Sequence, residues 1–361
     1  MNISISLIIP VYNSEKHLKN LFASLANQTR PFDEIIFVDN NSKDNSFNLC
    51  MEFKDNFKKS KIIVLKEEKK GPSAARNTGL KKASSEILAL TDADCELEKH
   101  WAENAVKYFA QDGQCEIIGG IAVGEEIFGR QNKFSSYTEE FSYYYWTLNR
   151  QTKKPYIMAS PDDFFSDAPF TIATYNMAMK RIVFEKTKGF DERLLNNEDT
   201  EWWMRTCLLG FKSLVGMPDL KVCHHNRSEL SSLYKQYYNY GEGLPYILKK
   251  FFKNRFLITF RSSKKLEFKG ITGLIEINPH TLLYLCVIFN TIFLPLKVIP
   301  VWFILLFAAR FILIFKYLSK IKTDNILKKT LIFSFIMEVR QFAWSYASLK
   351  GSVKYKTICV L

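Results

Sequence analysis

The sequence lacks several features that would assign it quickly to a class. Its seven cysteines are scattered, odd in number and without a Cys-x-x-Cys pair, which argues against a disulfide framework and a structural zinc site. No Gly-x-Gly-x-x-Gly or Walker sequence signals a hydride cofactor or an NTPase. The first residues, MNISISLIIPVYN, have no basic stretch of the kind that begins an export signal. We therefore expect reduced thiols and a cytosolic compartment.

Acidic residues are scarce in the C-terminal third. Residues 231–361 hold 20 Lys and Arg but only 5 Asp and Glu, in a chain whose net charge is +13. The basicity thus belongs to a region of long apolar runs, and residues 1–230 are nearly neutral. This distribution favours an anionic membrane surface as a partner and argues against nucleic acid.

The longest apolar runs fall short of the roughly 20 residues that a membrane-spanning helix needs. They are 281–296 and 298–315, and basic residues flank the pair on both outer sides, which favours a hairpin near 281–316 with both ends in the cytosol. A buried helical core or a surface-lying pair is the alternative, because Arg310 is costly in lipid. We expect 246–361 to be a basic, helical, membrane-associated region at the cytoplasmic face of the cell membrane. A further stretch, 326–347, mixes apolar and basic residues and is a candidate for the membrane surface.

Residues 3–125 alternate short apolar runs with helical patterns. The apolar runs are rich in Ile, Val and Leu, as strands buried on both faces should be: 5–11, 34–39, 61–66, 86–92 and 115–123. Stretches long enough for three helical turns lie between them: 14–27, 44–58, 73–84 and 98–110. The alternation predicts an α/β fold with a mostly parallel sheet and helices on both faces, whose ligands bind at the carboxyl ends of the strands.

Two aspartates, Asp92 and Asp94, end the fourth of these runs in the segment TDAD. In an extended chain residues i and i+2 point to the same side, so their carboxylates would lie close together. Hard oxygen ligands suit Mg²⁺ or Mn²⁺, which complete their shells with substrate phosphates. The triplet alone is a weak signal, because aspartate is also common in turns.

Five segments, in this order and spacing, resemble the signature segments of family 2 glycosyltransferases of the membrane-associated bacterial type, which have the GT-A fold: SLIIPVYNSEKHL, EIIFVDNNSKDNS, KGPSAARNTGL, ALTDADC and NNEDTEWWMR. The resemblance covers roughly residues 4–245. It implies a Rossmann-like GT-A domain over 1–245, in which the irregular, aromatic segment 126–170 is an acceptor-side insertion.

The resemblance also implies the reaction. The enzyme would transfer a hexosyl or related sugar from a nucleotide-sugar donor, such as a UDP- or GDP-sugar, to a saccharide or lipid-linked acceptor in polysaccharide biosynthesis. Transfer would invert the anomeric carbon and depend on Mn²⁺ or Mg²⁺. Processive members carry Gln-x-x-Arg-Trp before their membrane helices, whereas this chain has only RQFAW at 340–344. The difference favours transfer of a single sugar.

Individual roles follow from matching positions in the family's segments. The donor-binding residues would be Pro10, Val11, Tyr12, Asp39, Arg76, Asn77 and Asp92. The metal would be held by Asp94, Asp92 and His224, with His225 as the alternative histidine, because neighbours in a strand point apart. Asp199 would be the catalytic base that takes the acceptor's hydroxyl proton, and Glu198, Trp202 and Trp203 would lie on the acceptor side.

The residues alone leave plainer alternatives open. Asp39 would also suit a turn, Arg76 a solvated helix face, and Glu198 with Asp199 a helix N-terminus. The two tryptophans would also suit the core. A metal-dependent nucleotidyl or phosphoryl transferase would place a D-x-D at a sheet edge too, and a non-catalytic scaffold of a glycan assembly complex is a third possibility.

Overall fold

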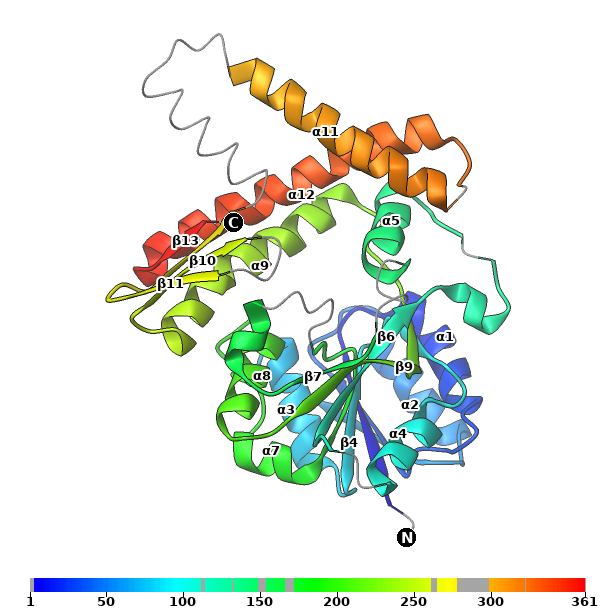
Figure 1. Cartoon of the computed structure of the whole chain (residues 1–361). Coiled ribbons are helices and arrows are strands. Elements are labelled where there is room, and N and C mark those ends of the chain that lie inside the picture. The colour runs from blue at the N-terminus through cyan, green and yellow to red at the C-terminus, as the bar shows by residue number, and fades with distance from the viewer. Residues whose placement is uncertain are drawn as a thin grey trace. The chain divides into compact units, whose positions relative to one another are not determined.

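The structure, a computed structural model, forms two compact units (Figure 1). The N-terminal unit comprises Met1–Asn132 and Tyr143–His225, and the C-terminal unit comprises Lys133–Ser142 and Asn226–Leu361. The structure describes residues 3–111, 114–131, 133–148, 154–165, 172–260, 265–277, 299–321 and 323–360.

The N-terminal unit begins with the strands and helices that the apolar pattern predicts. The strands are β1 (Ile5–Val11), β2 (Glu34–Asp39), β3 (Lys61–Lys66) and β4 (Ile87–Thr91). The helices are α1 (Glu15–Ala26), α2 (Ser46–Asn56), α3 (Pro72–Lys82) and α4 (Trp101–Ala110). Nearly every residue of β1, β2 and β4 is buried, which confirms strands covered on both faces.

The central sheet is mixed, although the sequence predicted a mostly parallel one. Within the described residues its order is β3-β2-β1-β4-β8-β6-β9-β5, with β7 beside β9. The first four strands are parallel, but β8 (Asn176–Lys180) runs antiparallel between β4 and β6 (Ile117–Val123). Two short strands, β5 (Cys95–Leu97) and β7 (Tyr156–Met158), pair antiparallel with β9 (Ser213–His224). Buried strands of either direction read as apolar runs, so the pattern did not reveal direction.

Helices cover both faces of this sheet, as predicted. Apolar residues of α1, α2 and α4 join one face of β1 in a single buried cluster. On the other face α3 approaches β1 closely, because a Cβ at Gly79 would lie 2.4 Å from Cγ2 of Ile8. The unit is completed by the helices α7 (Arg181–Thr187) and α8 (Glu198–Leu208) and the short helical turns Glu125–Phe128, Tyr143–Leu148 and Pro161–Phe165.

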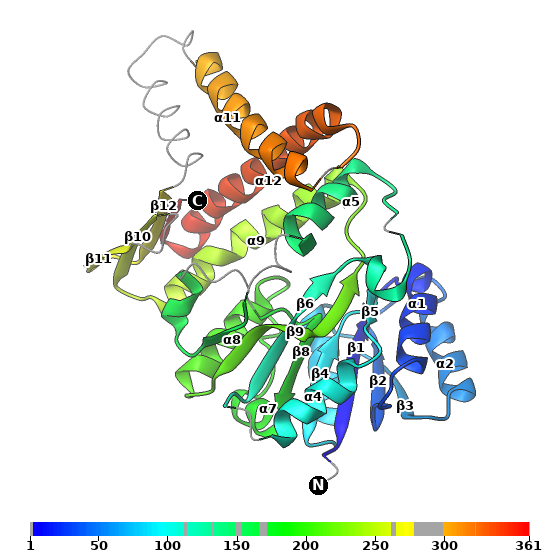
Figure 2. The same ribbon diagram turned by 45° about the vertical axis from the view of Figure 1, so that its right-hand side comes forward.

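The C-terminal unit is built on two long helices that lie side by side, α9 (Leu230–Phe251) and α12 (Ile326–Tyr355) (Figure 2). Its other helices are α5 (Tyr137–Ser142) and α11 (Ile299–Lys320). A small sheet, which the sequence analysis did not predict, has the order β11-β10-β12-β13. Its strands are β11 (Lys265–Lys269), β10 (Arg255–Phe260), β12 (Gly273–Ile277) and β13 (Ile358–Val360).

The boundary between the units falls between His225 and Asn226, before the domain end expected at 245. The physical reason is that α9 is one continuous helix, which packs along α12 on both sides of position 245. The segment 126–170 is also divided, because Lys133–Ser142 belongs to the C-terminal unit. There, Lys329 of α12 forms a buried ion pair with Glu140 (2.6 Å).

The predicted membrane hairpin at 281–316 falls only partly on described residues. The first run, 281–296, lies outside them, whereas α11 contains the second from Ile299 onward. Arg310, the costly residue of that run, forms an ion pair with Glu338 of α12 (2.9 Å). No helix in the part of the chain that the structure describes combines the length and the hydropathy of a bilayer crossing. The membrane hairpin therefore stays a prediction.

Candidate active site

The D-x-D segment lies in a turn between β4 and β5. The backbone N–H of Cys95 donates to the carbonyl of Asp92 (3.2 Å), so the backbone here is not the extended one that the sequence suggested. The two carboxylates consequently meet different partners. Oδ1 of Asp92 accepts a hydrogen bond from Arg76 (2.9 Å), whereas Oδ1 of Asp94 lies 3.7 Å from Nε2 of His224.

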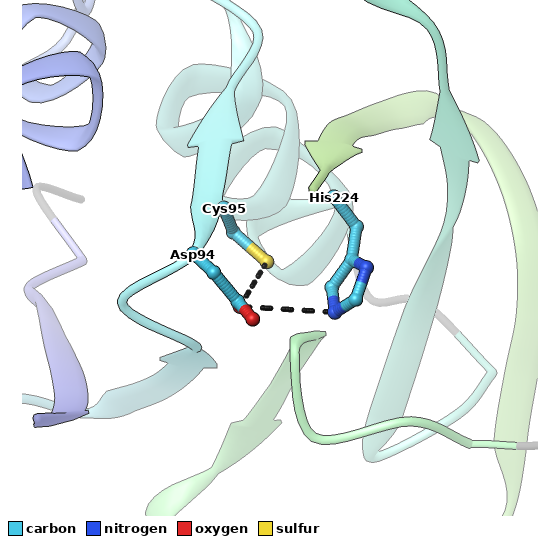
Figure 3. A group of neighbouring side chains, drawn as sticks. All are labelled: Asp94, Cys95 and His224. Atoms are coloured by element: carbon cyan, nitrogen blue, oxygen red, sulfur yellow. Dashed lines mark hydrogen bonds and ion pairs between the residues drawn. The ribbon is translucent and has the colours of Figure 1, made fainter. Parts of the chain in front are cut away.

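Three side chains converge beside this turn (Figure 3). Asp94, Cys95 and His224 each offer one ligand atom, and these atoms lie within 4.8 Å of one another. They meet because Cys95 and His224 are register partners in the antiparallel β5–β9 pair. A carboxylate suits Mg²⁺ or Mn²⁺, and an imidazole is a common ligand of divalent transition metals, so the group fits a divalent cation. Asp92, which was also predicted to bind the metal, is not part of it.

Cys95 is the member of this group that the sequence analysis missed. Its Sγ lies 3.8 Å from Oδ1 of Asp94, and burial together with the charges of Asp94 and Asp92 raises the pKa of the thiol. No motif signalled it, because its proximity to His224 depends on a strand pairing between distant segments. All six cysteines in the described residues are free.

The two adjacent histidines point to different partners, as expected for neighbours in a strand. Nε2 of His225 lies 2.9 Å from Oε1 of Glu96, and its ring stacks on His17 at a centroid distance of 5.2 Å. The hydrogen bond with Glu96 raises the pKa of His225. Its backbone N–H donates to the carbonyl of Asp94 (3.0 Å). His225 therefore joins the ends of β5 and β9, and His224 is the histidine that faces Asp94.

Arg76 connects the D-x-D turn to the start of α8. Its Nη2 donates to Oδ1 of Asp92 (2.9 Å) and its Nη1 to Oε1 of Glu198 (2.8 Å). The Arg76 side chain is only 4% exposed, so the solvated-helix alternative is wrong. Burial opposes its charge, but the two carboxylates raise the pKa of Arg76. Ion pairs of this kind are costly to break, since each partner is then left buried and unpaired.

The Glu198–Asp199 pair forms the first turn of α8. The preceding Asn197 adopts the left-handed conformation (φ 58°), which asparagine tolerates better than most residues. Oδ1 of Asp199 accepts a hydrogen bond from the backbone N–H of Thr200 (2.7 Å). Burial, and next the negative charge of Glu198, raise the pKa of Asp199 to about 7. A carboxylate with a pKa near neutrality suits general-base chemistry.

The predicted donor residues at the ends of β1 and β2 differ in what they offer. Asp39 is buried, and its Oδ1 has no hydrogen-bond partner among the described residues. Such an oxygen costs free energy unless a ligand donates to it. Tyr12 is 60% exposed just beyond β1. Val11 turns its side chain into the core and Pro10 is half-buried, so Val11 offers a ligand only its backbone.

Asn77 was predicted to bind the donor, but the protein itself engages its amide. Nδ2 donates to the carbonyl of Phe190 and to Oε1 of Glu192 (both 2.9 Å), and Oδ1 accepts from the N–H of Phe190 (2.8 Å). A Cβ at Gly189, whose φ is +82°, would lie 2.2 Å from Oδ1 of Asn77. We therefore assign Asn77 to holding the loop 189–192 against α3, which corrects the donor assignment.

Both tryptophans of α8 are buried. Trp202 donates its Nε1–H to Oγ1 of Thr187 (3.1 Å), and its ring lies against Phe190 at 5.3 Å. It fills the core, so stacking on an acceptor is not available to it. The Nε1 of Trp203 is also buried but has no hydrogen-bond partner in the described part of the chain. An acceptor role for Trp203 stays a prediction.

Comparison with known proteins identifies the family. A sequence profile described as "Glycosyl transferase family 2" matches residues 6–178. Residues 6–178 belong to glycosyltransferase family 2. The profile covers the D-x-D turn and Arg76, whereas Asp199 and His224 of this transferase lie beyond its end.

Relatives of this transferase share part of their length with it. Glycosyltransferase AglE of Haloferax volcanii is 27% identical over 242 residues, which are 66% of this chain and 72% of AglE. Minor teichoic acid biosynthesis protein GgaA of Bacillus subtilis is 35% identical over 117 residues, 31% of this chain and 26% of GgaA. The mannosyltransferase PcManGT of Pyrobaculum calidifontis, solved with GDP-Man and Mn²⁺, is 16% identical with a TM-score of 0.54, covering 99% of this chain and 88% of PcManGT. The last similarity shows a GT-A-like fold.

Proposed function

We propose that this family 2 glycosyltransferase transfers a single sugar from a nucleotide-sugar donor, UDP- or GDP-linked, to a saccharide or lipid-linked acceptor in glycan biosynthesis. Transfer inverts the anomeric carbon and depends on Mn²⁺ or Mg²⁺. The observation that carries the proposal is the buried Arg76, whose guanidinium bonds to both Asp92 and Glu198. Arg76 thereby links the D-x-D segment, which is predicted to face the donor, with the start of α8, which is predicted to hold the base.

The donor side is built from the strand ends. The unpartnered Oδ1 of Asp39 accepts a hydrogen bond from the nucleotide, which offsets the cost of its burial. The exposed ring of Tyr12 offers an apolar face one residue beyond Val11, the register partner of Asp39. Arg76 donates a hydrogen bond to Oδ1 of Asp92 and so holds the Asp92 carboxylate in its orientation toward the sugar-nucleotide. PcManGT, which was solved with GDP-Man and Mn²⁺, supports a nucleotide sugar as the donor.

Asp94 and His224 are the residues that would hold the cation, with the Cys95 thiol beside them. When bound, a divalent cation neutralises the charge that develops on the leaving nucleoside diphosphate. His225 keeps the two ligands in place, because its backbone and its ring tie β9 to Asp94 and to Glu96.

Asp199 acts as the general base. It takes the proton of the acceptor hydroxyl while the acceptor oxygen forms a bond to the anomeric carbon, and the electron pair of the breaking bond leaves with the nucleoside diphosphate. Attack from the face opposite the leaving group inverts the configuration. Arg76 pairs with Glu198, and the Glu198 charge contributes to the raised pKa of Asp199, which makes Asp199 a stronger base.

The test is a screen of UDP- and GDP-sugars with Mn²⁺ or Mg²⁺, reading released nucleoside diphosphate and the anomeric configuration of the product by NMR. The reaction should depend on Asp199, and Asp199→Asn should slow it by about 10²–10⁴-fold. Asp55→Asn, on the exposed end of α2, is the matched control and should be fully active. Retention of configuration would refute the inverting mechanism. Consumption of an NTP with nucleotide sugars left intact would favour a nucleotidyl transferase instead.

A further inference from the structure

Exposed apolar residues form a stripe along one side of α12, interrupted between Phe335 and Phe342, where Glu338 pairs with Arg310 of α11. We define it by six exposed residues, Leu327, Leu331, Phe335, Phe342, Tyr346 and Leu349, and Val353 continues it by one turn. At about 100° per residue, all of these positions fall within an arc of roughly 100°. At about 1.5 Å per residue the stripe is roughly 40 Å long. It is therefore one face of the helix and not a set of scattered surface residues.

The other exposed residues of α12 are all lysines. Lys328, Lys350 and Lys354 lie along one edge of the stripe, and α12 exposes no acidic residue. Its single acidic residue, Glu338, is partly buried and pairs with Arg310 of α11. Lys350 donates to the hydroxyl of Tyr238, and Lys354 approaches Glu242 at 3.5 Å. The edge of the stripe thus carries positive charge with little compensation.

The opposite face of α12 is fixed in the interior of the C-terminal unit. Phe333 contacts Phe141 of α5 at a ring distance of 5.6 Å, and Trp344 contacts Tyr237 of α9 at 5.8 Å. Ala343 and Ala347 are fully buried. The stripe is therefore a preformed surface of a packed helix. Its apolar residues belong to the outer face of α12, and they are not core residues exposed by poor packing.

We propose that the α12 stripe docks on an anionic lipid bilayer, with the helix lying parallel to the membrane plane. Single exposed apolar residues are normal on soluble monomers, but seven large ones on one face of one helix are not. An apolar face with aromatic residues and a lysine edge fits the boundary between acyl chains and anionic headgroups. A second copy of the chain fits less well, because the lysine edge would meet no acidic residue on another α12 stripe.

The neighbouring helix α11 offers the same chemistry. Among its described side chains, Ile312, Leu313 and Phe315 are exposed together with Lys316 and Lys320. Its sequence contains no acidic residue. Two helices of one unit thus expose apolar and basic side chains and no acidic ones, as docking on an anionic bilayer requires.

The first test measures cosedimentation of the full-length chain with neutral phosphatidylcholine vesicles and with vesicles that also contain anionic phosphatidylglycerol. The double variant Phe342→Ser, Tyr346→Ser should bind both kinds of vesicle about tenfold more weakly, because it removes two apolar anchors. The matched control is Ile157→Ser, Leu209→Ser, which removes two similarly exposed apolar residues of the N-terminal unit. The control should bind like the wild type, and equal binding of both double variants would overturn the proposal.

The second test separates charge from apolar burial. The triple variant Lys328→Gln, Lys350→Gln, Lys354→Gln should lose about tenfold or more in binding to anionic vesicles and nothing on neutral ones. Three exposed lysines of the N-terminal unit, changed to glutamine, provide a control of equal net charge: Lys82, Lys107 and Lys186. If the control loses as much binding as the stripe variant, the attraction is a property of net charge and the α12 edge has no special role.

The third test locates the contact. In Tyr346→Trp, brominated lipids should quench the added tryptophan fluorescence, whereas the added tryptophan of Leu209→Trp should be unaffected. Absence of quenching at position 346 would overturn the docking geometry. The chain could instead self-associate in the absence of vesicles. If Phe342→Ser, Tyr346→Ser abolished that self-association, a second copy would be the occupant of the stripe and the lipid proposal would be refuted. None of these measurements reads sugar transfer, so they stand or fall independently of the proposed function.

Discussion

The two units bury their apolar residues in contrasting ways. In the N-terminal unit the strands β1, β2 and β4 are almost entirely buried, and the charged residues of the candidate site gather at the strand ends. In the C-terminal unit α12 buries one face and exposes an apolar stripe edged by lysines. The contrast teaches that the nearly neutral unit keeps charge inside, where it has chemical consequences. The basic unit buries one ion pair, Lys329–Glu140, but places the lysines of the α12 edge outside, beside apolar surface.

The largest effect should come from the internal charge of Asp199. Asp199→Asn should lower kcat by about 10²–10⁴-fold, the usual contribution of a general base. In the wild type kcat/KM should rise with pH and level off above about pH 7, because Asp199 must be ionised to accept a proton and burial raises its pKa to about 7. A pH–rate profile in the free-enzyme regime checks this. A flat profile from pH 5 to 8 would contradict the assignment.

The buried guanidinium of Arg76 should matter most for stability. Arg76→Leu leaves Asp92 and Glu198 without their buried partner, and we expect the free energy of unfolding to fall by about 3–5 kcal/mol. Arg193 pairs with Asp191 at the surface, and 80% of the Arg193 side chain is exposed. Arg193→Leu should therefore change the free energy of unfolding by at most about 1 kcal/mol. Chemical denaturation of both variants makes the comparison. Similar losses of stability from the two variants would contradict the buried position of Arg76.

One pair of phenylalanines tests the two faces of α12. Phe333 is 2% exposed and Phe342 is 52% exposed. Phe333→Ser should lower the free energy of unfolding of the C-terminal unit by about 3–5 kcal/mol. Phe342→Ser should change this free energy of unfolding by less than about 0.5 kcal/mol. Thermal unfolding in the absence of lipid distinguishes the faces, and a large loss from Phe342→Ser would show that the stripe is covered within the protein.

The raised pKa of Asp199 should be visible as pH-dependent stability. Its folded-state pKa lies above the ordinary value of 3.8, so the folded state binds more protons and loses stability as pH rises from about 4 to 7. Asp199→Asn removes this loss. The variant should be more stable than the wild type by up to about 4 kcal/mol at pH 8, with no advantage near pH 4. Unfolding free energies at both pH values are the measurement.

The smallest effect should come from single metal ligands. His224→Ala removes one of the side chains that face Asp94, and Mn²⁺ affinity measured by calorimetry should fall about tenfold. Lys221→Ala, a substitution at a partly exposed site of the same strand, should leave Mn²⁺ affinity unchanged. If His224→Ala binds Mn²⁺ as well as the wild type does, the cation is held elsewhere.

The candidate site was only partly predictable. Asp92, Arg76 and Glu198 were each named from matching segments, but that Arg76 bonds to both carboxylates appears only when α3, β4 and α8 meet. Asn77 and Trp202 match the family's segments equally well. In the folded chain, however, the Asn77 amide bonds to the loop at 189–192, and the Trp202 side chain packs in the core. A motif states which residue occupies a position and does not state which of its atoms are already engaged.

The α/β alternation, the aspartates at the strand ends and the basic character of the last third can be read directly from the sequence. Local periodicity and charge encode these features, because each depends on residues close together in the chain. Tertiary structure alone decided the antiparallel course of β8, the meeting of Cys95 with His224, and which residues of 326–347 face outward. These depend on pairings between distant segments, whose register and direction leave no local trace in the sequence.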